Sequence, residues 1–176
     1  RSHIQNEKYY SMISDDYFKL AIKESHRFDV IFLDGLHTYS QTLRDFLSSL
    51  ALADSHTIWL IDDTIPTSAI AAEPDLNRVL KARQILDCAD DKTWMGDVYK
   101  VIAFIQSNFP QFTCLTTEGH GQTFVLPTEN ISPTRLFNNL REIENLNYID
   151  SILLQESLLC RVSFDEIIDK IKNLRD

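Results

Sequence analysis

The sequence predicts an α/β protein with a partial, doubly wound sheet that is mostly parallel, ends in an antiparallel hairpin and carries a helical C-terminal tail. Three observations favour this class. Two short runs of β-branched and aromatic residues, 28–34 and 57–62, have the composition of buried parallel strands. The amphipathic segment 39–52 between them predicts a helix that crosses from one strand to the next. Two later apolar runs, 112–117 and 122–126, are joined by a glycine-containing turn that predicts the hairpin.

The first strand should be preceded by a helix that begins at Ser14 and ends near Ser25. Ser14 can cap this helix, and Asp15 and Asp16 would lie in its positive first turn. The crossover helix 39–52 has its apolar residues at helical spacing. Asp45 falls on the other side of that helix, so we expect a solvated charge there. The apolar residues of the crossover helix are Leu43, Phe46, Leu47 and Leu50.

Further helices are expected over 75–86 and 98–109, the second ended by Pro110. In the tail, Ser132-Pro133 has the form of a helix cap with proline at the first position. Ser163 and Glu166 form a capping box for a last helix over 164–174. We therefore divide the chain into an α/β domain, 1–130, and a helical tail, 131–176.

Composition limits the class of partner. The chain has 176 residues, 44% of them hydrophobic, and a formal net charge of −9, with a pI near 4.9. This charge argues against nucleic acid as a partner. No apolar run approaches the ~20 residues of a membrane span, so no membrane partner is expected. The three cysteines are widely spaced and predict reduced thiols in a cytoplasmic protein.

Chemistry-bearing side chains follow the two predicted parallel strands. Asp34 and His37 come after the first strand, and Asp62 and Asp63 after the second. In open α/β sheets, ligands bind beyond the carboxyl ends of the strands, so these side chains should meet. Carboxylates suit Mg²⁺ or a similar divalent cation, and His37 could act as a general base. The alternative is structural: strand-end aspartates often accept loop amides, and a histidine near a helix terminus is often a surface residue.

Four elements in a fixed order carry a family resemblance. They are Ser14-Asp-Asp-Tyr-Phe18, Asp34-Gly-Leu-His37, the pair Asp62-Asp63 and Trp94-Met-Gly-Asp-Val-Tyr-Lys100. From about Tyr9 to about Leu126 the chain resembles class I S-adenosylmethionine-dependent methyltransferases, in particular small-molecule and sugar O-methyltransferases. The resemblance implies a Rossmann-like methyltransferase sheet, S-adenosylmethionine as the cofactor and a hydroxyl of a small molecule or sugar as the acceptor. It also implies a divalent metal at Asp34, Asp62 and Asp63.

The resemblance covers the carboxyl-terminal half of that fold. The glycine-rich turn and the ribose-binding acid that hold the cofactor in such enzymes are not found in this sequence. No cofactor-binding residue is assigned, and we expect a fragment or a form without the cofactor site that does not bind S-adenosylmethionine by itself.

Two other functions stay open from the residues alone. One is a non-catalytic interaction or dimerisation module derived from the same fold. The other is a metal-dependent hydrolase that uses Asp34, Asp62 and Asp63 around a water. We also expect a homo-oligomer, because a sheet cut beside a central strand leaves an open edge. The contact would use that edge or the tail residues Leu136, Leu140, Ile143 and Leu153.

Overall fold

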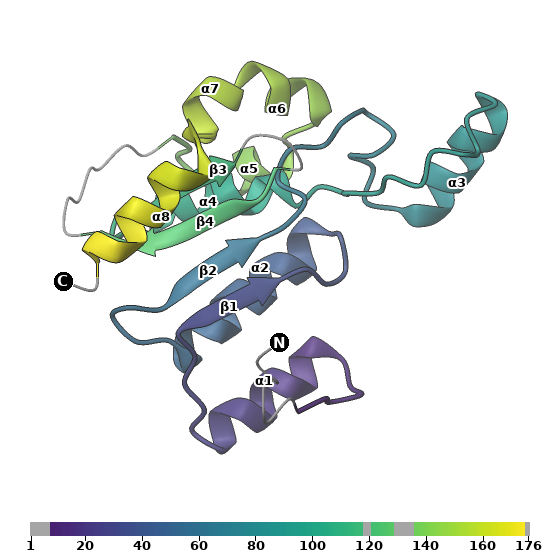
Figure 1. Cartoon of the computed structure of the whole chain (residues 1–176). Coiled ribbons are helices and arrows are strands. Elements are labelled where there is room, and N and C mark those ends of the chain that lie inside the picture. Colours follow the sequence, from purple (N-terminus) through teal and green to yellow (C-terminus); the bar gives the residue numbers. More distant parts are fainter. Residues whose placement is uncertain (1–7, 118–120, 129–135, 175–176) are drawn as a thin grey trace.

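The computed structural model describes residues 8–117, 121–128 and 136–174. Within these ranges, the strands form one five-stranded sheet in the order β1-β2-β4-β3-β5 (Figure 1). Their bounds are β1 Val30–Leu33, β2 Ile58–Ile61, β3 Phe112–Thr117, β4 Thr123–Pro127 and β5 Arg161–Val162.

Strand directions confirm the predicted fold class. β1 pairs with β2 in parallel, and β3 pairs with β5 in parallel. β4 is antiparallel to both of its neighbours, β2 and β3. Since only β4 runs against the other described strands, the sheet is mostly parallel. The β3–β4 hairpin is antiparallel, as expected from the sequence.

Helices surround this sheet and protrude from it. Their bounds are α1 Ser14–Lys23, α2 Tyr39–Ser49, α3 Leu76–Ile85, α4 Tyr99–Asn108, α5 Leu140–Glu144, α6 Tyr148–Leu153, α7 Gln155–Leu158 and α8 Phe164–Asn173. A 3₁₀ turn, Leu50–Leu52, extends α2. α3 stands apart from the sheet (Figure 1). Among the described helices, none is both long and apolar enough to cross a membrane.

The larger core lies between the sheet and helices α2 and α4. Phe46 of α2 and Trp59 of β2 are fully buried there, with ring centroids 5.7 Å apart. The indole Nε1 of Trp59 donates to Ser49 Oγ at 2.8 Å, so burial leaves no unpaired donor. Burying such side chains stabilises the fold by about 1.5–3 kcal/mol each, which fixes β2 and therefore the loop that follows it.

The opposite face is covered by α8. Ile167 is fully buried there against Ile58, Leu115 and Leu126. The predicted capping box at the start of this helix is confirmed: Ser163 Oγ accepts from the Glu166 backbone, and the Glu166 carboxylate accepts from the Ser163 backbone. The segment after residue 130 thus contributes a strand, β5, and a covering helix to the main sheet.

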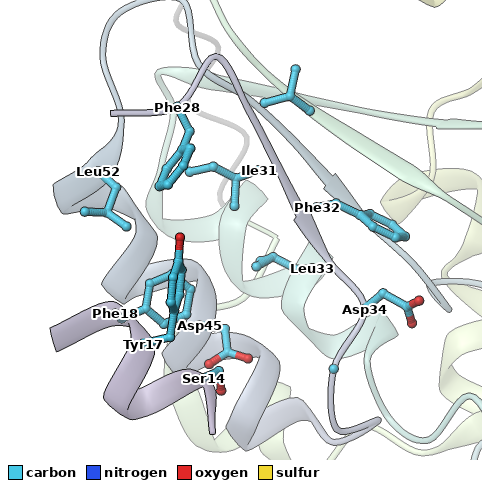
Figure 2. A pocket seen from close by; sticks show the side chains of 12 residues that line it. Ser14, Tyr17, Phe18, Phe28, Ile31, Phe32, Leu33, Asp34, Asp45 and Leu52 are labelled. Atoms are coloured by element: carbon cyan, nitrogen blue, oxygen red, sulfur yellow. The ribbon is translucent and has the colours of Figure 1, made fainter. Parts of the chain in front are cut away.

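β1 forms an open edge of the sheet among the described residues. Val30 and Phe32 are 56% and 52% exposed on one face, whereas Ile31 and Leu33 are buried on the other. A cavity of about 320 Å³ lies along this edge, lined mainly by apolar residues of β1 and α1 together with the acids Asp34 and Asp45. Figure 2 shows Phe18 of α1 on the side of β1 to which Leu33 points, and Phe32 directed away from it.

Two local predictions about α1 and α2 are wrong. Ser14 is the first helical residue rather than the cap, and Ile13 in the cap position makes no side-chain hydrogen bond. Ser14 Oγ instead accepts from Gln41 Nε2 at 3.1 Å. Asp45 is only 6% exposed, and Gln41 Nε2 also donates to its Oδ1 at 2.9 Å. Both differences arise because α1 packs against α2 and covers the helix face expected to be solvated.

The tail residues proposed for self-association divide into two groups. Ile143 is buried in the larger core, and Leu136 is partly buried and packs against that core. Leu140 and Leu153 are exposed. The predicted Ser132-Pro133 cap lies outside the described residues. All three cysteines are free thiols, as expected.

Candidate functional site

The carboxyl ends of β1 and β2 lie side by side, which places Asp34 next to Asp62. Leu33 and Ile61, the last residues of the two strands, are register partners. The Asp62 backbone N–H donates to the Leu33 carbonyl at 3.1 Å. The parallel pairing expected from the sequence therefore brings the four predicted site residues to one edge of the sheet. Asp34, His37, Asp62 and Asp63 all line one small hollow there.

His37 and Asp63 are in direct contact. The imidazole Nδ1 lies 2.5 Å from Asp63 Oδ2, and both side chains are largely covered. The contact brings the imidazole against a carboxylate, although Nδ1 has no hydrogen-bond partner of good geometry. The other ring nitrogen, Nε2, has no polar partner within the described part of the chain. It is therefore the nitrogen that can exchange a proton with a ligand.

Asp63 is an electrostatically unfavourable place for a carboxylate. Burial is the main cause that raises the pKa of its carboxyl from 3.8 to about 6. The charges of Asp62 and Asp34 raise this pKa further, whereas His37 lowers it. A cation placed among the three carboxylates would relieve this repulsion.

The backbone at Asp63 is also constrained. Its φ of 60° lies in the left-handed region that a non-glycine residue adopts at a cost. Asp62 Oδ1 accepts from the Asp63 backbone N–H at 3.0 Å. On the other side, the Thr64 N–H donates to the Gly121 carbonyl at 2.8 Å, and the Thr64 hydroxyl contacts Gly121 and Thr123. The β3–β4 hairpin thus holds Asp63 in place.

The segment 94–97 packs over the loop that carries His37. The Trp94 indole stacks on the imidazole of His37, with centroids 5.0 Å apart and planes inclined by 15°. Gly96 lies directly against the His37 backbone. Asp97 Oδ1 accepts from the Tyr39 N–H at 2.6 Å, at the start of α2, and its Oδ2 lies 3.0 Å from Lys100 Nζ. Asp97 thus accepts from the first backbone N–H of α2, beside the N-cap Thr38, whose side chain accepts from the Gln41 N–H.

The donor set fits a divalent cation. One ligand atom from each of Asp34, His37 and Asp63 lies within 4.8 Å of the others. Ions such as Mg²⁺ and Ca²⁺ hold oxygen ligands at about 2.0–2.6 Å, so the ligands of one ion lie at most about 5 Å apart. Asp62 lines the same hollow. Its Oδ1 accepts from the Asp63 backbone N–H, which leaves Oδ2 available to bind a cation. Metal ligation by Asp34, Asp62 and Asp63 stays a prediction.

Sequence reasoning missed two features around this site. Trp94 is a ring partner of His37, and Asp45 is a buried acid whose Oδ2 would lie 3.7 Å from a Cβ at Gly35. The Trp94-Met-Gly-Asp97 motif was the sequence feature that could have indicated the contact of Trp94 with His37. Its contact with residues nearly 60 positions earlier is tertiary and leaves no periodic trace in the sequence.

Residues 3–64 match the model of a family described as "Methyltransferase domain". This segment is a little more than a third of the 176-residue chain. It contains α1, β1, α2 and β2, and it ends just beyond Asp62 and Asp63. No curated protein matches the chain, and no solved structure does. Together with the mostly parallel α/β sheet and the acids at its strand ends, the match supports a methyltransferase family.

Proposed function

We propose that this chain builds the acceptor side of an O-methyltransferase site. In this reaction a methyl group passes from S-adenosylmethionine to a hydroxyl of a small molecule, with a sugar as one candidate, and a divalent cation such as Mg²⁺ assists. The observation that carries the proposal is the contact of His37 Nδ1 with Asp63 Oδ2, beside Asp34 and within the segment that matches the methyltransferase family.

The base in this proposal is His37. Its Nε2 takes the proton of the acceptor hydroxyl while Nδ1 stays against Asp63, whose negative charge stabilises the imidazolium that forms. The acceptor oxygen then forms a bond to the methyl carbon as the bond from that carbon to sulfur breaks. The proton ends on His37, and the sulfonium becomes a neutral thioether. Orientation of the hydroxyl is the main task of the protein, because the methyl group is already activated.

The cation would be held by Asp34, Asp62 and Asp63. Two of these carboxylates are in the cluster of potential ligands, and the third lines the same hollow. Such an ion would supply positive charge that lowers the pKa of a neighbouring hydroxyl. Asp63 can serve both neighbours, since Oδ2 faces His37 and Oδ1 remains for the ion.

The methyl donor is proposed from the family match alone. When bound, S-adenosylmethionine supplies an electrophilic methyl group. The hollow beside His37 has a volume of about 10 Å³, which is about the size that one water requires and too small for an adenosyl group. Because no observation places the donor, we assign no described residue to it, and we assign the proton chemistry of the acceptor to this chain.

The test combines cation binding with methyl transfer. Calorimetry with Mg²⁺ and Mn²⁺ should detect binding to the protein, and Asp34→Asn or Asp62→Asn should weaken it at least tenfold. In a protein that also supplies the donor-binding half, transfer of a labelled methyl group from S-adenosylmethionine to a panel of hydroxyl compounds should fall with EDTA. The matched control is Asp29→Asn, an exposed acid at the other end of β1. Cation binding that survives in both site variants would contradict the proposal.

The same protein samples distinguish the metal-dependent hydrolase from the methyltransferase. A hydrolase would consume an ester or phosphoester substrate with the cation alone and would not need a methyl donor. Turnover without S-adenosylmethionine would therefore favour that alternative over methyl transfer.

A further inference from the structure

Trp94 makes a contact that packing alone does not require. Its ring is partly exposed, and it lies flat on His37 with an interplanar angle of 15°. The described aromatic pairs of the main core, by contrast, are mostly tilted or edge-on, as Phe46 and Trp59 are. This offset, nearly parallel stack covers part of one face of the imidazole and restricts the tilt of that ring.

Trp94 is itself held from its far side. Its Nε1–H donates to the Glu73 carbonyl at 2.8 Å. The backbone N–H groups of Met95 and Gly96 both donate to the Ala71 carbonyl, at 2.9 and 2.8 Å. The indole is therefore fixed to the segment that leaves β2, independently of His37. A ring with its own anchors can orient a neighbour rather than follow it.

His37 needs such an orienting partner because its contact with Asp63 does not supply one. Nδ1 is close to Asp63, yet it makes no hydrogen bond of good geometry. An ion pair attracts the ring but hardly restricts its tilt. The stacked indole restricts the tilt, and the contact with Asp63 selects which nitrogen faces that carboxylate.

We propose that Trp94 is a positioning residue for His37: the indole fixes the plane of the imidazole so that Nδ1 stays against Asp63 and Nε2 remains the proton-accepting atom. This assignment rests on the proposed function where it concerns turnover. The orientation of the ring can be measured without any reaction.

The first experiment is nuclear magnetic resonance on the metal-free protein. In the native protein, the ring protons of His37, assigned with His37→Gln, should be shifted upfield by the indole ring current. Trp94→Leu should remove this shift, and Trp94→Phe, which keeps a ring but loses the bond to Glu73, should retain part of it. The internal control is His26, which packs against Phe28 and should not change. Unchanged His37 signals in Trp94→Leu would overturn the proposal.

The second experiment is kinetic. Trp94→Leu should lower kcat by about 10–100-fold, the loss expected when a catalytic group is misplaced, with little change in KM. Trp94→Phe should restore most of the rate. Equal losses in both variants would refute positioning by the ring, and so would a normal kcat in Trp94→Leu. If a protein that also supplies the donor-binding half transfers no methyl group at all, the proposed function fails, and the magnetic resonance result alone decides whether Trp94 orients His37.

Discussion

Gly96 and His37 touch through their backbones. A Cβ added at Gly96 would lie 1.6 Å from the His37 carbonyl oxygen, and Gly96 has a φ of 59°. The close approach and the left-handed backbone both require glycine at this position. This contact joins the segment 94–97 to the loop after β1, and it makes the site dependent on a residue that carries no functional group.

Gly96→Ala should therefore destabilise the protein by about 2 kcal/mol or more, because a backbone carbonyl cannot move as a flexible side chain can. Urea unfolding measures the loss. The control is Gly35→Ala in the same site, where a Cβ would meet Asp45 Oδ2 at 3.7 Å, an ordinary contact. Equal free energies of unfolding for the two variants would show that the segment 94–97 can shift without loss of stability.

Asp63→Asn should stabilise the metal-free protein at pH 7. Burial raises the pKa of Asp63 to about 6 in the folded chain, above its ordinary value of 3.8. The folded state thus binds the proton more tightly than the unfolded state, so this stability is present below pH 4 and lost as pH rises through 6. At pH 7 the ionised group costs about 3 kcal/mol, which asparagine avoids while tolerating the positive φ.

Urea unfolding at pH 4 and pH 7.5 in EDTA measures this effect, and most of the gain should appear at the higher pH. Asp87→Asn is the matched control, since Asp87 also has a positive φ, 53°, but is exposed. A less stable Asp63→Asn protein at pH 7.5 would mean that the ion pair with His37 outweighs burial.

In an intact parent protein with activity, His37→Ala should lower kcat by ~10²–10⁴, the usual range for loss of a general base. The affinity for Mn²⁺ should stay the same, because Asp34, Asp62 and Asp63 are the proposed ligands. His56→Ala, at an exposed position, is the control for loss of an imidazole. A large fall in Mn²⁺ affinity in His37→Ala would instead make His37 a ligand of the ion.

Self-association should use the open edge of β1. Unpaired backbone groups beside the exposed Val30 and Phe32 can accept another strand. Phe32→Lys should shift the protein towards monomer in analytical ultracentrifugation, whereas Leu153→Lys, at a 74% exposed site in the tail, should not. If Leu153→Lys and not Phe32→Lys gave monomers, the interface would lie in the tail. A monomeric native protein would contradict the prediction.

The sequence was sufficient for features that depend on local pattern and strand order. Apolar runs predicted four of the described strands, and parallel pairing of the first two predicted that Asp34 and Asp62 would be neighbours. β5 has two residues and is too short to leave a periodic signal. The positions of Trp94, Gly96 and Asp97 over the His37 loop were not predictable in the same way. Their partners lie nearly 60 residues earlier and are selected by tertiary packing.

The hydrogen bonds at Ala71 have a consequence for how the protein can change. The Ala71 carbonyl accepts from the backbone N–H groups of both Met95 and Gly96. The segment that carries α3 therefore begins and ends at the same place beside the sheet. The entropic cost of closing such a loop grows only with the logarithm of its length, so the loop can gain or lose residues with little loss of stability. Insertions and deletions in the α3 segment should therefore be tolerated without moving Asp34, His37 and Asp63 at the strand ends.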